Sequence, residues 1–119
     1  MHASKSDLPV VAEMPGFESR QAEWGGFTAA IETIAGGLDA TEMFADLPDG
    51  QCQSPHWGFV LRGKFRVKYA DHEEVISEGE AYYLPPGHIP LTDADTVLIE
   101  FSPASGEYEK TLGAAGATS

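Results

Sequence analysis

The sequence predicts a single all-β domain, a sandwich or barrel built from two sheets. Short apolar segments recur at close spacing through the middle of the chain, and the helical signal is confined to its carboxyl-terminal end. In residues 64–69 (KFRVKY), apolar and basic side chains alternate with a period of two, which is typical of a strand with one buried face. A chain of 119 residues, 42% of them hydrophobic, suffices for one core and one domain.

The expected elements follow from the composition of each segment. Residues 1–23 mix polar and apolar side chains around two prolines and predict an extended arm without long regular structure. The body, residues 24–112, closes with a short helix indicated by the serine and proline at positions 102 and 103. Residues 113–119 are expected to form a frayed, flexible tail. Strands are expected over residues 27–35, 41–45, 57–61, 64–69, 74–76, 81–84 and 96–101.

The charge balance argues against two classes of partner. Seven Lys and Arg against 19 Asp and Glu give a formal net charge of −12, which repels nucleic acid phosphates and anionic lipids. The first residues lack the apolar run of a signal peptide, and no segment approaches the ~20 apolar residues that span a membrane. We therefore expect a cytoplasmic protein that binds neither nucleic acid nor membranes. Cys52 is the only cysteine, so its value lies in packing, reactivity or metal binding.

One motif in the second half of the chain resembles the second motif of the cupin family. That motif is a glycine, five residues, and then Pro-x-Gly-x-x-His. In the segment GEAYYLPPGHIP, Gly79, Pro85 and Gly87 match it, and Pro90 stands at the position of the histidine. His88 lies two residues earlier, and positions two apart in an extended chain share a face, so His88 can reach the space that the usual histidine fills.

A second segment resembles the first cupin motif, which is His-x-His, three or four residues, Glu, six residues, and Gly. Gly63 matches the closing glycine, and His56 falls at the glutamate position. The places of the two upstream histidines fall on Gly50 and Cys52 or, with the other gap length, on residues 49 and 51. The resemblance implies a cupin-like double-stranded β-helix, or jelly-roll barrel, with a metal between its strands. It also implies a homodimer, formed through a sheet face or by exchange of an amino-terminal strand.

Two carboxylates extend the candidate ligand set. Glu32 in AAIETI and Glu100 in VLIEF are each the only charge in an apolar strand segment. Burying an unpaired carboxylate costs on the order of several kcal/mol, so each must face solvent or have a partner. If both face the cavity together with Cys52, His56 and His88, this mixed oxygen, nitrogen and sulfur set suits zinc, iron, nickel or copper.

Each candidate also has a structural interpretation without a ligand. His56 could be a core histidine bonded to a carbonyl, His88 could cap the Pro-Pro-Gly turn, and Cys52 could be a small buried apolar residue. The carboxylates could face solvent or pair with arginine. A nucleophilic pair of Cys52 and His56 is disfavoured, because four residues of extended chain separate them by ~13 Å unless the loop folds back.

Three functions are compatible with these patterns. The first is a small-molecule-binding cupin that holds a divalent transition metal through a non-standard ligand set. The second is a metal-dependent enzyme of the isomerase, cyclase or dioxygenase type on a small organic substrate, with Glu32 or Glu100 as acid or base. The third is a partner-binding module whose cavity is filled by its own side chains. The fold cannot choose among them, because function resides in the site.

Overall fold

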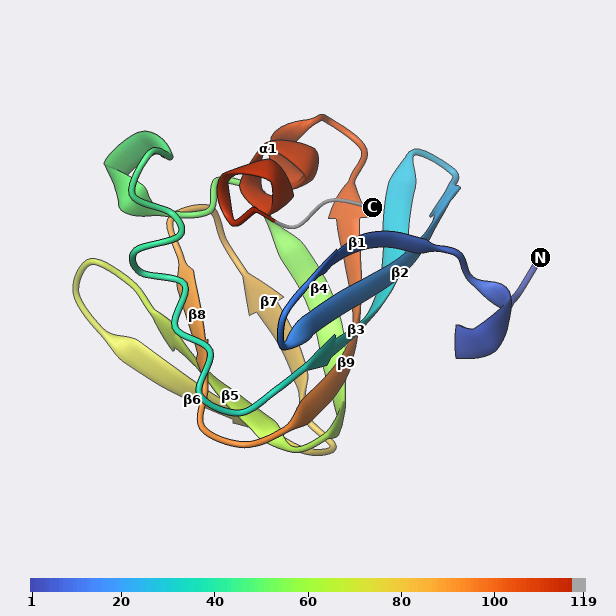
Figure 1. Ribbon diagram of the computed structural model, residues 1–119, viewed down its shortest axis with the longest axis horizontal. Coiled ribbons are helices and arrows are strands. Elements are labelled where there is room, and N and C mark those ends of the chain that lie inside the picture. Colours follow the sequence, from blue (N-terminus) through green and yellow to red (C-terminus); the bar gives the residue numbers. More distant parts are fainter. Residues whose placement is uncertain (117–119) are drawn as a thin grey trace.

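The computed structural model describes residues 1–116 as two antiparallel sheets that pack face to face (Figure 1). The six-stranded sheet has the order β1-β2-β3-β9-β4-β7, and the three-stranded sheet has the order β6-β5-β8. The strands are β1 (Val10–Met14), β2 (Phe17–Trp24), β3 (Phe27–Ile34), β4 (His56–Arg62), β5 (Lys64–Lys68), β6 (Glu73–Ser77), β7 (Ala81–Leu84), β8 (Ile89–Thr92) and β9 (Thr96–Pro103). The prediction of an all-β jelly-roll barrel with a short carboxyl-terminal helix is confirmed.

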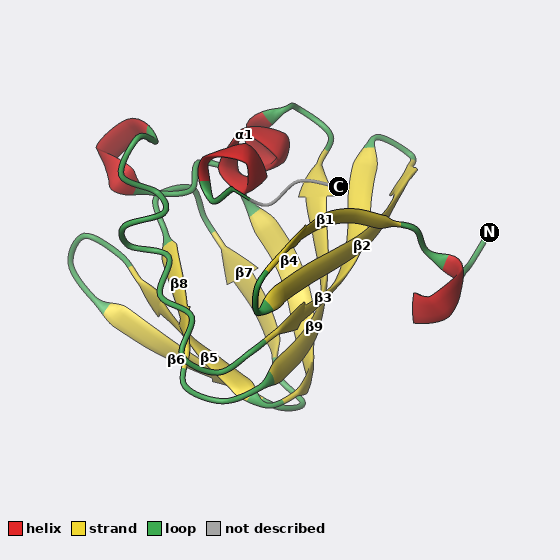
Figure 2. Ribbon diagram, in the orientation of Figure 1, coloured by secondary structure: helices red, strands yellow, loops and turns green. Residues whose placement is uncertain are grey.

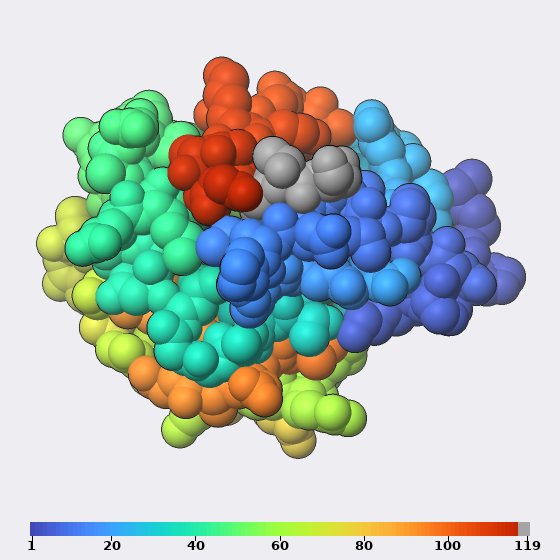
Figure 3. Space-filling view, in the orientation of Figure 1, coloured from blue at the N-terminus to red at the C-terminus, as the bar shows by residue number. Residues whose placement is uncertain are grey.

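Helical structure in the described residues is short, with α1 at one end of the strands and η1 apart from it near the amino terminus (Figure 2). It comprises the 3-10 turns η1 (Lys5–Asp7) and η2 (Pro48–Gly50) and the helix α1 (Glu107–Ala114). Figure 3 shows α1 packed between the green segment that contains η2 and the blue amino-terminal strands. No helix in this part of the chain is long and apolar enough to cross a membrane.

Side-chain alternation places a large apolar core between the two sheets. In β5, Phe65 and Val67 are buried while the basic residues between and beside them are partly or fully exposed. The core cluster consists of Ile34, Val60, Phe65, Val67, Ile76, Tyr82, Leu84 and Leu98. A second, smaller cluster of Ala40, Phe44 and Cys52 packs against Ala115, just beyond α1. The large cluster therefore fills the space between the sheets, and the smaller one lies beside the end of α1.

The motif glycines fit tight turns in this frame. Gly63, between β4 and β5, has a φ of +83°, and a Cβ there would collide with the carbonyl oxygen of Asp95. Gly87 has a φ of +95° and turns the chain immediately before His88. Only glycine adopts such conformations without strain, so these two positions support the loops that frame the interior.

The prediction of an amino-terminal arm without long regular structure is wrong for most of the segment. β1 pairs with β2, and all eight residues of β2 pair with β3. The strand signal of β2 is weak because two of its inward positions carry polar side chains, Ser19 and Gln21, both buried. Apolar alternation cannot reveal a strand that faces a polar interior.

Three further expectations differ from the structure. Residues 41–45 form hydrogen-bonded turns instead of a strand, with the Phe44 amide donating to the carbonyl of Ala40. The strand β8 was not predicted, because it begins directly after the turn at Gly87. Ser102 and Pro103 end β9 instead of starting a helix, and α1 begins only after Gly106. Of the expected tail, residues 113 and 114 complete α1, and residues 117–119 lie outside the described part.

Candidate metal centre

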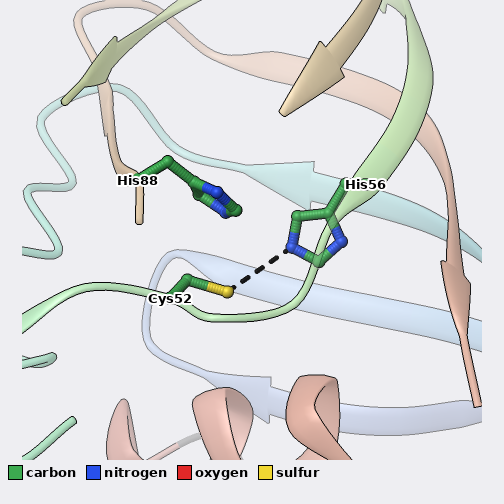
Figure 4. Close-up of side chains that lie close together, drawn as sticks. All are labelled: Cys52, His56 and His88. Atoms are coloured by element: carbon green, nitrogen blue, oxygen red, sulfur yellow. Dashed lines mark hydrogen bonds between the residues drawn. The ribbon is translucent and has the colours of Figure 1, made fainter. Parts of the chain in front are cut away.

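Three buried side chains converge inside the barrel near α1 (Figure 4). Cys52 precedes β4, His56 is the first residue of β4, and His88 directly precedes β8. One sulfur and two ring nitrogens, one from each residue, all lie within 4.8 Å of one another. The three residues are between 1% and 4% exposed, so water has little access to them.

Backbone pairing brings the two loops of this cluster together. Cys52 and His88 form an isolated antiparallel bridge, in which the Cys52 amide donates to the His88 carbonyl at 2.9 Å. The Gly87 amide donates in return to the Cys52 carbonyl at 2.8 Å. The chain then folds back before β4, so that the Cys52 sulfur lies 3.6 Å from Nε2 of His56. A separation of ~13 Å is expected unless the loop folds back, and residues 52–56 do fold back instead of forming a continuous strand.

In each histidine, Nδ1 forms a hydrogen bond with a group outside the cluster. Nδ1 of His88 donates to the Pro85 carbonyl at 2.8 Å, and because a carbonyl only accepts, this nitrogen carries the proton. Nδ1 of His56 lies 2.6 Å from the Ser102 hydroxyl and 3.6 Å from a carboxylate oxygen of Glu100. Such contacts fix the tautomer and orientation of metal-binding histidines and leave Nε2 free to coordinate.

Burial keeps both imidazoles neutral. It lowers the pKa of His56 to about 3 and, together with the neighbouring His56 ring, lowers the pKa of His88 to about 4. Burial also raises the pKa of the Cys52 thiol to about 11, although hydrogen bonds with Thr111 and the Ser54 carbonyl act in the opposite direction. The two imidazoles are thus in the protonation state that ligation needs, and the thiol has to lose its proton to bind a metal.

Glu32 and Glu100 face the same interior, but the three-donor cluster does not include them. Glu100 accepts a hydrogen bond from the Tyr82 hydroxyl at 2.8 Å, and Glu32 accepts one from the Tyr108 hydroxyl. Burial raises the pKa of Glu100 to about 7. Burial first, and then the charge of Glu100, raise the pKa of Glu32 to about 8. Two carboxyl groups that titrate near neutrality therefore lie beside the candidate ligands.

A cavity of about 90 Å³ adjoins the cluster. Cys52, His56 and His88 line it together with both glutamates, and the rest of its wall is mostly apolar. Its apolar wall includes Met14, Phe17, Ile34, Leu38, Met43, Phe44, Phe65, Leu84, Leu98 and Leu112. A partner-binding module filled by its own side chains is expected to have no such space.

Four residues around the cluster were not predicted from the sequence. Ser102 and Tyr82 occupy inward strand positions, and alternation from Glu100 and Leu84 could have indicated them. Tyr108 and Thr111 are the two buried residues of α1, three positions apart on one helix face. The Thr111 hydroxyl lies 3.2 Å from the Cys52 sulfur, so α1 completes the wall of the site.

The donor set fits a transition metal. Two imidazole nitrogens and one thiol are the ligands that zinc, copper, nickel and iron accept, and three protein ligands leave a position for water or an organic ligand. The hydrogen bonds from the outer ring nitrogens of His56 and His88 are those that such sites require. The cluster therefore has the chemistry of a metal centre that is accessible from a cavity.

Comparison with known proteins identifies the fold. No family model matches the chain, and no curated protein matches it by sequence. An RmlC-like cupin from Shewanella frigidimarina is similar in structure at 15% identity, with a TM-score of 0.63 over 89% of this chain and 93% of that chain. Ectoine synthase from P. lautus is similar at 10% identity, with a TM-score of 0.68 over 92% and 85% of the two chains.

A third solved structure agrees with these two. KdgF from Halomonas sp. is similar at 20% identity, with a TM-score of 0.54 over 80% of this chain and 86% of that chain. At these identities the likeness concerns the fold alone. The motif residues Gly63, Gly79, Pro85 and Gly87, the two-sheet topology and the solved structures agree, and the chain has the cupin fold.

Proposed function

We propose that this cupin barrel holds a divalent transition metal on Cys52, His56 and His88 and binds a small, largely apolar organic molecule in the adjoining cavity. One observation carries the proposal: three buried donor atoms lie within 4.8 Å of one another, beside a space that no Lys or Arg of residues 1–116 lines. Nε2 of His88 is unprotonated because its Nδ1 donates to the Pro85 carbonyl. The Ser102 hydroxyl can accept a hydrogen bond from Nδ1 of His56, and in that tautomer Nε2 of His56 is free as well. The apolar wall of the cavity favours a ligand with hydrocarbon surface.

Among the expected metals, the donor types favour zinc or copper over iron. One thiolate and two imidazoles form a nitrogen and sulfur set of the kind that zinc binds tetrahedrally, with the fourth position open in catalytic sites. Iron sites of the oxygenase type use two histidines and a carboxylate instead, and here Glu100 contacts His56 rather than joining the cluster.

A second function, a metal-dependent enzyme, is supported by the two glutamates. Their pKa values of about 8 and about 7 are those of groups that can accept and return a proton at neutral pH. Tyr108 and Tyr82 hold the carboxyl groups in position. A bound metal would supply a Lewis acid at the cavity. An isomerase, cyclase or dioxygenase on a small organic substrate remains the alternative to a binding protein, and a fold neighbour whose name is that of a synthase supports it.

Metal analysis tests the first function. Protein purified without added metal salts is expected to contain about one transition metal ion per chain, and Cys52→Ser, His56→Ala and His88→Ala are each expected to lower that content strongly. His72→Ala is the matched control, because His72 is exposed and its ring pairs with Asp71 and Glu74 and stacks on Tyr69, none of which belongs to the cluster. Metal content that is absent from the wild type, or equal in the wild type and the three variants, contradicts the proposal.

Turnover separates the second function from the first. Metal-loaded protein is incubated with a small-molecule extract, and the consumed and produced compounds are identified by mass spectrometry. The enzyme function expects at least one compound to be converted by the wild type and not by Glu100→Gln. An extract that stays unchanged, while a compound binds, supports the binding function alone.

A further inference from the structure

The charges around the cavity select the kind of ligand that it accepts. We infer that the ligand is an organic amine, whose cationic head pairs with Glu32 and whose apolar body lies against the aromatic and aliphatic wall. This inference rests on the proposed function, because it specifies the ligand of the same cavity.

No positive side chain reaches this interior. All seven Lys and Arg lie in the described residues, and none of them lines the cavity. Several have partners at the surface: Arg20 pairs with Glu18, and Arg66 pairs with Asp93. The seven are Lys5, Arg20, Arg62, Lys64, Arg66, Lys68 and Lys110. An anionic ligand that loses its water on entering the cavity would therefore gain no ion pair with a lysine or arginine in return.

Neither Glu32 nor Glu100, in contrast, forms an ion pair with a lysine or arginine. Glu32 is 6% exposed and Glu100 is 5% exposed. The hydroxyls of Tyr108 and Tyr82 satisfy one oxygen of each, and the nearest ionisable base of Glu100 is the His56 ring, which burial keeps neutral. A buried carboxylate is stable only if it is paired with a cation or protonated. A positive group of the ligand would complete this arrangement.

Charge counting for the metal-loaded site gives the same result. A divalent ion and the Cys52 thiolate together carry a net charge of +1. If both glutamates are ionised, they add −2, and the net charge of the site becomes −1. A single ammonium group makes this interior neutral, whereas a carboxylate ligand increases the imbalance. Without the metal, an ammonium group has to take the place of the proton that burial keeps on Glu32 near neutral pH.

The remaining wall defines the rest of the ligand. Phe17, Phe44 and Phe65 line the cavity together with methionine and leucine side chains. A hydrocarbon body gains from leaving water at such a wall, and aromatic rings also attract a nearby cation. With a volume of about 90 Å³, the cavity suits a short-chain amine better than a polyvalent or sugar-sized molecule.

The test uses three probes that differ only in the head group: butylamine, butanol and butanoate. Each is titrated into metal-loaded wild-type protein at neutral pH, and binding is followed by the NMR shift of the Thr111 amide, which lies at the site. The inference predicts that butylamine, which is protonated at this pH, binds about tenfold or more tightly than butanoate. Equal or tighter binding of butanoate overturns it.

A substitution assigns the preference to Glu32. Glu32→Gln is expected to weaken butylamine binding about tenfold and to change butanol binding by no more than about twofold. The matched control is Glu23→Gln on the exposed edge of β2, which is expected to leave all three probes unchanged. Unchanged butylamine binding in Glu32→Gln overturns the inference, and if this variant does not fold, the wild-type order of the three probes still decides.

The outcomes also separate this inference from the proposed function. If butanol and butanoate bind and butylamine does not, the cavity binds small molecules, and only the inferred amine is wrong. If none of the probes binds to metal-loaded protein, the ligand-binding part of the proposed function is wrong as well.

Discussion

The sulfur of Cys52 lies 3.6 Å from Nε2 of His56, although the two residues are four positions apart at the entrance to a strand. The contact exists because the backbone of Cys52 pairs with His88 from another loop, while His56 is held in β4. A site built in this way depends on the closure of two loops and not on a single ligand-bearing strand. The candidate ligands and the residues that hydrogen-bond to them can therefore be tested by separate substitutions.

Ser102 is predicted to tune the affinity for the metal without binding it. Its hydroxyl lies 2.6 Å from Nδ1 of His56 and orients the ring. Ser102→Ala is expected to lower metal affinity by about 10-fold to 100-fold, measured by competition with a chelator. Ser105→Ala, at an exposed position just after β9, is the control and is expected to keep the wild-type affinity. Equal affinity in the two variants contradicts a role for Ser102.

Glu32 is predicted to make the metal-free protein less stable as the pH rises. Burial and the nearby Glu100 raise the pKa of this carboxyl from 4.5 to about 8 in the folded chain. Because the folded pKa exceeds the unfolded one, the stabilisation is fully present below about pH 4.5 and is lost as the pH rises toward about 8. This group alone changes the unfolding free energy by at most about 1.4 kcal/mol per pH unit.

Urea denaturation of chelator-treated protein between about pH 5 and pH 8 measures this effect. The unfolding free energy of Glu32→Gln is expected to depend less on pH than that of the wild type. Glu23→Gln, at an exposed position of β2, should follow the wild-type curve. Parallel curves for the wild type and Glu32→Gln would show that Glu32 does not titrate as described.

Gly58 is predicted to be required for the close packing of three strands. A Cβ at this position would collide with the Tyr82 ring and with the carbonyl oxygen of Ile99. Gly58→Ala is expected to lower the unfolding free energy by about 1–3 kcal/mol. It is also expected to displace the Tyr82 hydroxyl, which donates a hydrogen bond to Glu100. Gly113→Ala, in α1, has no atom within 4 Å of the new methyl group and is expected to cause no loss of stability. Denaturation of both variants shows whether the cost is specific to Gly58.

The outer face of the large sheet is predicted to form a homodimer interface. Phe27, Trp57, Phe59, Tyr83 and Phe101 are 38% to 50% exposed there, and the Trp57 ring stacks on Tyr83. At roughly 150–250 Å² per aromatic side chain, the exposed part of these five is about 300–500 Å² per protomer. Two copies would bury up to about 1,000 Å² of it, the size at which specific association begins. Few charges interrupt this face, which favours a second copy over a charged partner.

Light scattering after size exclusion tests this interface. The wild type is expected to be a dimer, and Trp57→Ser is expected to shift it to a monomer. Val75→Ser removes an exposed apolar side chain from β6 in the other sheet and is expected to remain dimeric. A monomeric wild type contradicts the prediction.

The sequence indicated part of the site without settling its orientation. It left open whether Glu32 and Glu100 face the cavity or solvent, and it placed His56 inside only through the resemblance to the first cupin motif. All three are buried. Strand alternation missed β2, because the interior that it faces is polar. Alternation of apolar residues reveals a strand only where the core is apolar.

The remaining parts of the site depend on contacts between distant segments. The approach of Cys52 to His88 arises from loop pairing, which no periodicity in the sequence indicates. Tyr108 and Thr111 reach the interior only because α1 packs over the end of the barrel. The position of a short helix after a loop is decided by tertiary packing, so its contribution to the site became visible only in the folded chain.

X-ray absorption spectroscopy at the metal edge tests the central claim most directly. For zinc-loaded protein, the account predicts one sulfur ligand at about 2.3 Å and two imidazole nitrogens at about 2.0–2.1 Å, with the sulfur lost in Cys52→Ser. A coordination shell of oxygen and nitrogen without sulfur, or a wild-type spectrum unchanged by Cys52→Ser, would contradict it.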